Sequence, residues 1–561
     1  MAQTKDETLR ETTAQYLAGI NPVSSPDPAT LQADLLADVQ ATFDLENAMR
    51  AKNMQWKIPD RLTQSQIADI LIHLYPIVKI AYSGTDADKQ YDELAMYQSE
   101  GEDAGIYVSD QEMFRTLIRQ YCYTLSPQGI KDTMALIKDM APRVVRNSER
   151  NLVPVNNGIF DFDTKTLLPF DRSKIFVSKC RVDYNPQATN PIIHNPDDNT
   201  YWDVESWMQE ISNDPEIVNL LWEILGAIIR PLVPWNKMAW FYAETGNNGK
   251  GTLCELMRQL CGKGSYAAIR LADMGKEFYL EPLLHASAII TDENDVGAYI
   301  DKAANLKALV TGDAIQINRK FREPVAHQFR GFIVQCMNEM PRIKDKSDSF
   351  FRRQLFVPFD KCFTGIERKY IKEDYLKRKD VLEYVLWRVL NMSYYELSEP
   401  DACRLALEEY KEYNDPVRQF CTEVLPMAQW DMLPFAMLYD AYRKWFQQNV
   451  PSGTVQSKQS FNKDLVEIMR GSDAWDCLEK VVKEDKNASH MGCYEPIVKE
   501  YNLIGWMNAD YVAGNSAAYN NRYMPAPGQY AQKSFRGVLI RKSVSIQDDA
   551  TDDVSDPQKC A

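Results

Sequence analysis

The sequence predicts a multidomain α/β protein with a helical N-terminal region, a central α/β core built around a glycine-rich loop, and a C-terminal domain of helices followed by a basic strand. Three observations lead to this prediction. A chain of 561 residues exceeds the usual size of one domain, so about three or four domains are expected. Helical periodicity dominates the first 110 residues. An apolar run at 238–243 looks like a buried strand and leads into a glycine-rich loop and a helical pattern.

The composition is that of a globular protein with an acidic surface. Hydrophobic residues make up 45% and charged residues 25% of the chain. The 64 Lys and Arg against 79 Asp and Glu leave a net charge of −15, so any contact with DNA must come from a local basic feature. Eleven cysteines without a CxxC pair and five dispersed histidines argue against a zinc site and indicate free thiols in a reducing compartment.

Neither a signal peptide nor a membrane span is predicted. The N-terminus is polar and contains acids. The most apolar segment, 217–235, carries Glu223 and Arg230. We therefore expect a cytoplasmic protein with no membrane partner.

Residues 1–149 are predicted to form a helical N-terminal domain. Helical periodicity extends over 31–54, and residues 64–75 form an amphipathic pattern on which His73 is interpreted as a structural residue. The acidic stretch 84–105 is expected to be a solvated hairpin face, and a further helix is expected at 110–125.

Short extended segments begin near residue 150, and we expect a small β and then helical collar module over 150–235. Residues 156–158 (NNG) predict a turn, and 159–162 alternates like a strand. Asp161 and Asp163 allow two interpretations: paired metal-binding carboxylates on one strand face, or simply the next turn. The turn is favoured because no third carboxylate or histidine lies nearby in the sequence.

The stretch 238–257 (MAWFYAETGNNGKGTLCELM) has the order of strand, glycine-rich loop, lysine, hydroxyl and helix that cradles a triphosphate. Backbone N–H groups of such a loop face the phosphates, and Lys250 adds a point charge. Gly246 and Gly249 are expected to let the backbone curl where a Cβ would clash. The predicted nucleotide-binding residues are Gly246, Asn247, Asn248, Gly249, Lys250, Gly251 and Thr252.

This loop departs twice from the common pattern GxxxxGK[ST]. Glu244 occupies the first glycine position. Gly251 stands where the Mg²⁺-binding hydroxyl is usual, so Thr252 is expected to take that role one residue late.

A second apolar run, 286–290, ends in Asp292 and Glu293. One carboxylate at a strand end can order the hydration shell of Mg²⁺, and its neighbour can activate the attacking water. About 40 residues separate Thr252 from Asp292, which is room for a helix and a connection in a βαβ unit. An acid pair at a strand end is otherwise common as a turn, and the distance from the loop favours the catalytic interpretation.

The segment 307–359 continues with a hairpin and two further strands. A turn at 311–313 and a strand at 314–318 lead to a basic, aromatic tip of Lys320, Phe321 and Arg322. The strand 332–337 ends at Asn338. Arg352 and Arg353 then precede a strand that ends at Phe359.

This order of motifs resembles the superfamily 3 helicases, and within them the phage and plasmid primase–helicases, including the C-terminal region of the poxvirus type. The sequence NGKGT at 248–252 and the start of the preceding module at 153–159 are similar to the family's patterns. The resemblance covers roughly 64–542 and is most specific from 238 to 359. It implies an AAA+-like ATPase domain with a lid at 236–400.

The resemblance also implies roles for individual residues. Lys250 would bind the β- and γ-phosphates, and Thr252 and Asp292 would bind Mg²⁺. Glu293 would be the base for water attack, and Asn338 would sense the γ-phosphate. Arg352 or Arg353 would be an arginine finger that acts on a neighbouring subunit's nucleotide and contributes about 10³–10⁵ in rate. Because the finger acts in trans, the resemblance implies a homo-hexameric ring. The alternative for the two arginines is a surface salt-bridge pair.

The tip formed by Lys320, Phe321 and Arg322 resembles the pore hairpin of these rings. Cations suit phosphates, and an aromatic face suits a base or sugar, without any reading of sequence. The alternative is a solvated hairpin.

The C-terminal region, 401–542, is predicted to be winged-helix-like. Two helices are expected at 434–449 and 457–469, and a basic strand at 532–542. This is the order of a winged helix, in which DNA contacts are expected from Lys458, Ser460, Lys463, Lys533, Arg536 and Arg541. The last residues, 543–561, are expected to be an acidic disordered tail.

The predicted function is that of an ATP-driven ring helicase that uses ATP and Mg²⁺, translocates on single-stranded DNA and unwinds forked DNA during replication of a phage, plasmid or other mobile element. A bacterial host cytoplasm is expected, and primase, polymerase and single-strand-binding protein are further candidate partners. Translocation along DNA in the 3′-to-5′ direction is implied by the resemblance alone. Two alternatives remain: a bifunctional primase–helicase, and a non-motor origin-binding protein with a vestigial nucleotide site.

Overall fold

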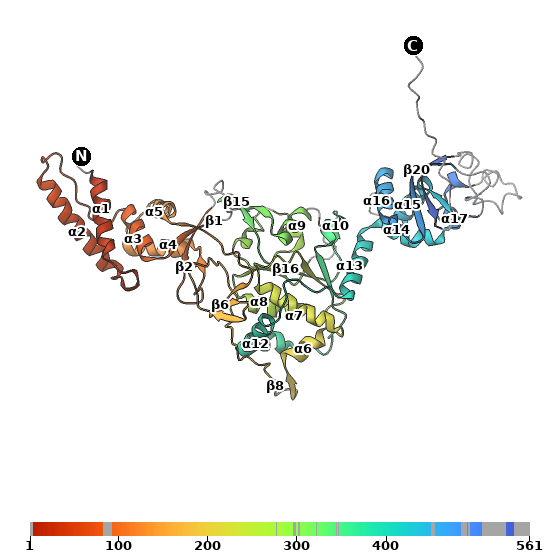
Figure 1. The fold of residues 1–561 in the computed structure, drawn as a ribbon, viewed down its shortest axis with the longest axis horizontal. Coiled ribbons are helices and arrows are strands. Elements are labelled where there is room, and N and C mark those ends of the chain that lie inside the picture. Colours follow the sequence, from red (N-terminus) through yellow and green to blue (C-terminus); the bar gives the residue numbers. More distant parts are fainter. Residues whose placement is uncertain are drawn as a thin grey trace, which may run out of the picture. The chain divides into compact units, whose positions relative to one another are not determined.

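The computed structural model divides the chain into two compact units, 1–407 and 408–561 (Figure 1). It describes residues 4–81, 92–276, 278–294, 299–300, 303–320, 322–343, 345, 347–449, 455–483, 491, 494–507 and 534–542. The protein is a mixture of helices and sheets, as predicted. Within the described residues, no helix is long and apolar enough to span a bilayer.

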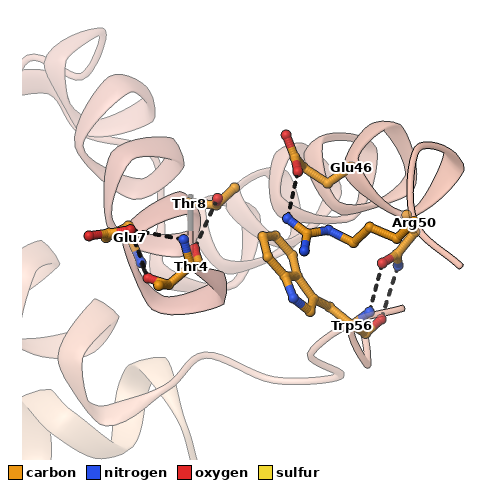
Figure 2. A network of polar contacts seen from close by, with 7 residues as sticks. Thr4, Glu7, Thr8, Glu46, Arg50 and Trp56 are labelled. Carbon is orange, nitrogen blue, oxygen red and sulfur yellow. Dashed lines mark hydrogen bonds and ion pairs between the residues drawn. The ribbon is translucent and has the colours of Figure 1, made fainter. Parts of the chain in front are cut away.

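The first unit begins with helices α1 (Lys5–Ala18) and α2 (Pro28–Ala48). A capping box opens α1: the Glu7 N–H donates to Thr4 Oγ1 (3.3 Å), and the Thr4 N–H donates to Glu7 Oε2 (2.8 Å), as Figure 2 shows. These bonds satisfy donors that the first turn of a helix otherwise leaves open.

The end of α2 is closed by Trp56. The Trp56 N–H donates to Asn47 Oδ1 (2.7 Å), and Asn47 Nδ2 donates to the Trp56 carbonyl (3.0 Å). The Arg50 guanidinium lies 3.7 Å from the centroid of the indole ring and pairs with Glu46 at 2.9 Å (Figure 2). Stacking and charge together hold the loop after α2 against the helix.

A four-stranded sheet follows, so the N-terminal region is less helical than the sequence predicted. Its order is β3-β2-β1-β4; along the chain α3 (Gln64–Leu74) precedes its first strand, and α4 (Gln111–Tyr121) and α5 (Pro127–Met140) lie between β3 and β4. The strands are β1 (Ile77–Ala81), β2 (Glu93–Tyr97), β3 (Tyr107–Val108) and β4 (Arg143–Val145).

The stretch 84–105, predicted as a solvated hairpin face, contains β2. Ala95 and Met96 are buried in the sheet, so the prediction is wrong for this strand, whose two buried residues stand among acids in the sequence. Residues 100–102 are exposed as expected, and 82–91 lie outside the described residues.

A small three-stranded sheet, β5-β6-β7, precedes the core. It consists of β5 (Leu152–Val155), β6 (Gly158–Asp161) and β7 (Thr166–Leu168). Asp161 accepts a hydrogen bond from the Asp163 N–H (3.0 Å), and Lys165 has a φ of 57°. The turn interpretation of this segment is therefore confirmed.

The core of the first unit is a five-stranded sheet in the order β11-β12-β16-β10-β18, in which every neighbouring pair is parallel. The strands are β10 (Met238–Tyr242), β11 (Tyr266–Ala267), β12 (Ala288–Thr291), β16 (Phe332–Met337) and β18 (Gln354–Pro358). Helices α7 (Pro215–Ile229), α8 (Lys250–Cys261) and α12 (Lys379–Leu390) share one hydrophobic cluster with it. Because parallel strands end at one edge, the residues after β10, β12 and β16 are brought together there.

The remaining elements of the first unit surround this core. They are the pair β8 (Ile193–Asn195) and β9 (Thr200–Trp202), α6 (Val204–Ile211), β13 (Tyr299–Ile300), α9 (Ala303–Thr311), the hairpin β14 (Ala314–Arg319) and β15 (Arg322–Gln328), β17 (Arg342–Ile343), α10 (Asp348–Phe351) and α11 (Lys369–Glu373). Short 3₁₀ helices lie at η1 (Pro22–Ser24), η3 (Leu271–Asp273), η4 (Glu281–Leu284) and η5 (Tyr375–Lys377). Helix α13 (Asp401–Asn414) contains the boundary between the units.

The second unit has an antiparallel sheet of order β19-β21-β20. Along the chain its elements are α14 (Pro416–Val424), η6 (Leu425–Met427), β19 (Met432–Pro434), α15 (Phe435–Asn449), α16 (Lys458–Met469), β20 (Trp475–Lys483), α17 (Pro496–Glu500), η7 (Ile504–Trp506) and β21 (Ser534–Arg541). Four aromatic residues of α15 are buried in its core: Phe435, Tyr442, Trp445 and Phe446. Gly537 has a φ of 84°, and a Cβ there would lie 2.4 Å from the Phe435 ring, so this position needs glycine.

Candidate functional site

The glycine-rich loop joins the end of β10 to the start of α8, as predicted. Its left-handed positions are Asn247 (φ 55°) and Gly249 (φ 87°). Glu244 is exposed and is not among the residues of positive φ, so the missing first glycine costs no backbone strain.

The expectation that Gly246 lets the backbone curl is wrong. Gly246 has no positive φ, and a Cβ there would meet nothing within 4 Å. Asn247 takes the left-handed conformation instead, which asparagine tolerates better than most side chains. The sequence could not separate these neighbours because both residue types favour turns.

Two asparagine side chains hold the loop in place. Asn247 Nδ2 donates to Thr364 Oγ1 (3.2 Å) and Glu367 Oε1 (3.1 Å), and its carbonyl accepts from the Phe363 N–H (2.7 Å). The buried Asn248 donates to the carbonyl of Thr245. We call residues 362–367 the strap, because this segment lies across the loop and fixes it.

No side chain caps the N-terminus of α8. Gly249 begins the helix, and Lys250, Gly251 and Thr252 form its first turn. The Thr252 N–H donates to the Gly249 carbonyl (3.1 Å), and the N–H groups of Lys250 and Gly251 are left for an anion, which the positive end of the helix dipole also favours.

Lys250 is buried, and its Nζ donates to Asn338 Oδ1 at 2.8 Å. Asn338 follows β16, the parallel neighbour of β10, so the sheet brings these two predicted residues together. Burial lowers the pKa of Lys250, an effect opposed only in part by the nearby thiols of Cys336 and Cys254. An anion at the loop would therefore stabilise the charged amine.

Asp292 follows β12 and pairs with Arg258 of α8 at 3.0 Å. Burial works against the charged Arg258, but Asp292 outweighs it and raises the pKa of the arginine. Glu293 is exposed beside this pair. Arg258 was not among the predicted residues, although its place two turns after Lys250 on the same helix was a possible signal.

Asn294 is a second residue that the sequence reasoning missed. Its Oδ1 accepts from the Leu271 N–H (2.9 Å), and its Nδ2 donates to Gln335 Oε1 and the Cys336 carbonyl (both 2.9 Å). Asn294 thus ties the segment that carries Asp292 to the neighbouring strand β16.

Within the described residues, no group of three or more His, Cys, Asp or Glu side chains could hold a metal ion alone. Thr252 and Asp292 nevertheless suit Mg²⁺, which binds through one or two protein oxygens together with water and substrate phosphates.

The two adjacent arginines lie in different environments. Arg352 is exposed, and its guanidinium has no hydrogen bond or ion pair with any residue that the structure describes. Arg353 is half-buried and donates to the carbonyl and Oγ of Ser349 in α10.

The predicted basic hairpin is present as β14 and β15, with an irregular register between Ile317 and Arg319. Lys320 is exposed in its turn. Phe321 and the side chain of Arg322 lie outside the described residues. The role of this tip in DNA binding stays a prediction.

Three stretches of the chain match known protein families. Residues 54–213 match the family described as "D5 N terminal like", and 412–495 match "Poxvirus D5 protein-like". Residues 241–353, which contain the site, match a family of unknown function (DUF5906).

A candidate helicase of Acanthamoeba polyphaga mimivirus is 27% identical over 242 residues, which are 39% of this chain and 23% of the mimivirus protein. The match thus spans less than a quarter of that relative's length.

These matches support the primase–helicase family. Assignment to superfamily 3 stays a prediction. Two solved structures of the NrS-1 C-terminal region are distantly similar. The first has 14% sequence identity and a TM-score of 0.40, and the match covers 84% of this chain and 99% of that structure. The second has 11% sequence identity and a TM-score of 0.41, and the match covers 85% of this chain and 100% of that structure.

Proposed function

We propose that the protein is an ATP-driven DNA helicase that works as a homo-hexameric ring on single-stranded DNA. The observation that carries this proposal is the contact of Lys250 with Asn338 at the edge of a parallel sheet, beside an uncapped helix N-terminus. The D5-type matches and the helicase-named relative support a replication helicase or primase–helicase.

The chain's own residues account for nucleotide binding and hydrolysis as follows. The triphosphate would lie against the N-terminus of α8, and Lys250 would exchange Asn338 for phosphate oxygens. Asn338 would then be free to position the γ-phosphate or the attacking water, and Glu293 would accept the proton of that water. Mg²⁺ would be held by Thr252 and Asp292 and would neutralise the charge that develops on the phosphate.

The pairing of Asp292 with Arg258 adds a step to this mechanism. The Asp292 oxygen that binds Arg258, Oδ1, is not available to a metal shell, so it would have to leave the arginine for Asp292 to hold Mg²⁺ through that atom. The salt bridge therefore describes a resting arrangement of the site.

Arg352 is the better candidate for the finger in trans. An arginine that reaches a neighbouring subunit's nucleotide must be exposed and uncommitted, which fits Arg352, whereas Arg353 is bound to Ser349 of its own chain. The tip of Lys320, Phe321 and Arg322 is proposed to grip DNA in the ring.

The second unit is proposed to be a winged helix that contacts DNA. Its order of helix, strand, helix, helix and strand, with a final strand after the short helices α17 and η7, supports this, as does its sheet order. Lys458, Lys463 and Arg536 line one groove of about 810 Å³ along α16. Arg541, predicted as a DNA contact, binds Asp431 (3.2 Å) and lies over Trp475, so we propose a structural role for it instead. Lys533 lies outside the described residues.

DNA-stimulated ATP hydrolysis and strand displacement test the proposal. The wild type is expected to do both, and Lys250→Ala is expected to lose both because the buried cation at the phosphates is gone. Lys131→Ala, which removes an exposed lysine of α5, serves as the control. Hydrolysis that survives Lys250→Ala would overturn the site. DNA binding by a wild type that hydrolyses no ATP would favour the non-motor alternative.

A further inference from the structure

A cavity of about 200 Å³ opens directly beside the glycine-rich loop. Gly249 and Thr252 line it on one side, Trp207 and Ile211 of α6 on a second, and the strap with α11 on a third. The cavity thus adjoins the turn of α8 at which the phosphates are proposed to bind.

Apolar side chains meet at the start of α8. A Cβ built on Gly249 would lie 3.7 Å from Phe363 Cε2 and 4.0 Å from Ile211 Cγ1. Ile366, which also lines the cavity, is 68% exposed. A large aliphatic side chain left open at a concave site is typical of a surface that a ligand covers.

The cavity is also lined by charged side chains of both signs, among them Glu367 and Glu373. Lys372 of α11 lines it, and its Nζ would lie 3.7 Å from a Cβ built on Gly251. The extra glycine after Lys250 therefore leaves room for a second lysine above the first turn of α8. Arg368, by contrast, is paired with Glu210 across the cavity wall.

We propose that this cavity seats the base and ribose of the nucleoside triphosphate. Phe363 and Ile366 contact the base, and Lys372 contacts the phosphate end of the nucleotide. The arrangement matches such a ligand because apolar walls and a cation both adjoin the turn of α8 that is proposed to receive the phosphates. This inference rests on the proposed nucleotide site: that site accounts for the phosphates, and the cavity accounts for the nucleoside.

The strap gives this cavity a second effect on the loop. Phe363 contributes both its ring to the cavity and its N–H to the Asn247 carbonyl. A base packed on the ring would stabilise the same segment that holds Asn247 in its left-handed conformation. Nucleoside binding thus favours the loop conformation that receives the phosphates.

The test compares ATP with inorganic tripolyphosphate, which has phosphates but no nucleoside, by calorimetric titration of the full chain. Phe363→Ala and Ile366→Ser are expected to weaken ATP binding about 10-fold each and to leave tripolyphosphate binding unchanged. Lys372→Ala is expected to weaken both ligands, because it acts on the phosphates. Leu405→Ser is the matched control for Ile366→Ser, since Leu405 is 65% exposed and does not line the cavity.

The outcomes separate the cavity from the phosphate site. If Lys250→Ala loses both ligands while Phe363→Ala and Ile366→Ser bind ATP normally, the cavity assignment is overturned and the phosphate site stands. If Phe363→Ala and Ile366→Ser weaken ATP and tripolyphosphate equally, these residues only hold the loop, and the assignment again fails. If Lys250→Ala binds both ligands normally, the phosphate site itself is wrong.

Discussion

The amine of Lys250 lies 2.8 Å from the amide oxygen of Asn338, although 88 positions separate the two residues in the chain. The contact exists because β10 and β16 are parallel neighbours that end at one edge of the sheet. This contact gives the buried Lys250 amine a neutral partner, with no carboxylate bound to it among the described residues, and so leaves its charge available to a phosphate.

Replacement of Asn338 by alanine is expected to lower kcat for ATP about 100-fold and to change the affinity for ATP little. The amide would act on the γ-phosphate or the water as charge develops, and one lost polar group of this kind costs about 10² in rate. Steady-state hydrolysis and equilibrium nucleotide binding measure the two quantities. Asn53→Ala, at an exposed position in a turn, is the control. A loss confined to ATP affinity would show that Asn338 only positions Lys250.

Removal of the Arg258 guanidinium is expected to lower the Mg²⁺ concentration that gives half-maximal hydrolysis. In Arg258→Gln, Asp292 no longer has to leave an ion pair, and a partly exposed pair of this kind is worth about 0.5–1 kcal/mol, or a 2- to 5-fold shift. Titration of hydrolysis with Mg²⁺ at saturating ATP gives the value. A higher Mg²⁺ requirement would mean that Arg258 orients Asp292 for the metal.

The motifs of the site could be predicted because each depends on a strand end, and buried strands are readable as apolar runs. The positions of Lys250, Asp292 and Asn338 after β10, β12 and β16 follow from that reading. Arg258 and Asn294 could not be predicted in the same way, because their contacts depend on how α8 and β16 lie in space.

The strap and β2 show two further limits of the sequence. Residues 362–367 have no regular structure over most of their length, and their bonds to Asn247 cross about 120 positions of the chain. Strand β2 carries only two buried apolar residues, and its charged neighbours resemble a solvated segment. Tertiary contacts decide both cases, and local periodicity does not record them.

Acid is expected to destabilise the first unit through His327. Burial, with the nearby Arg146, lowers the pKa of this histidine from 6.5 to about 3. At a pH between these two pKa values the unfolded chain binds a proton that the folded chain does not. The free energy of unfolding therefore decreases as the pH falls, by about 2 kcal/mol from pH 7 to pH 5. His327→Gln is expected to shrink this difference in denaturant unfolding, and His194→Gln, at an exposed site, is not. An equal loss in wild type and His327→Gln would exclude this histidine as the cause.

The groove along α16 is expected to bind duplex DNA through phosphates. The double variant Lys463→Ala with Arg536→Ala should reduce affinity for all sequences alike and lower the salt slope by about 2, one for each lost contact. Fluorescence anisotropy over a salt series measures both. Arg443→Ala with Lys444→Ala removes the same charge from exposed positions of α15 outside the groove and should leave the slope unchanged. ATP hydrolysis without DNA should be normal in both variants.

Mixing of two inactive variants tests the proposed finger. Arg352→Ala subunits bind ATP but lack the finger, whereas Lys250→Ala subunits lack a working phosphate site but keep Arg352. Each alone should lose about 10³ or more in hydrolysis. In a mixed ring, an Arg352→Ala site that adjoins a Lys250→Ala subunit regains a complete set of residues, so the mixture should hydrolyse more ATP than either variant. Recovery with Arg353→Ala, and none with Arg352→Ala, would reverse the assignment. The contact of Arg353 with Ser349 in its own chain argues for the expected result, because that arginine must first break an existing bond to reach a neighbour.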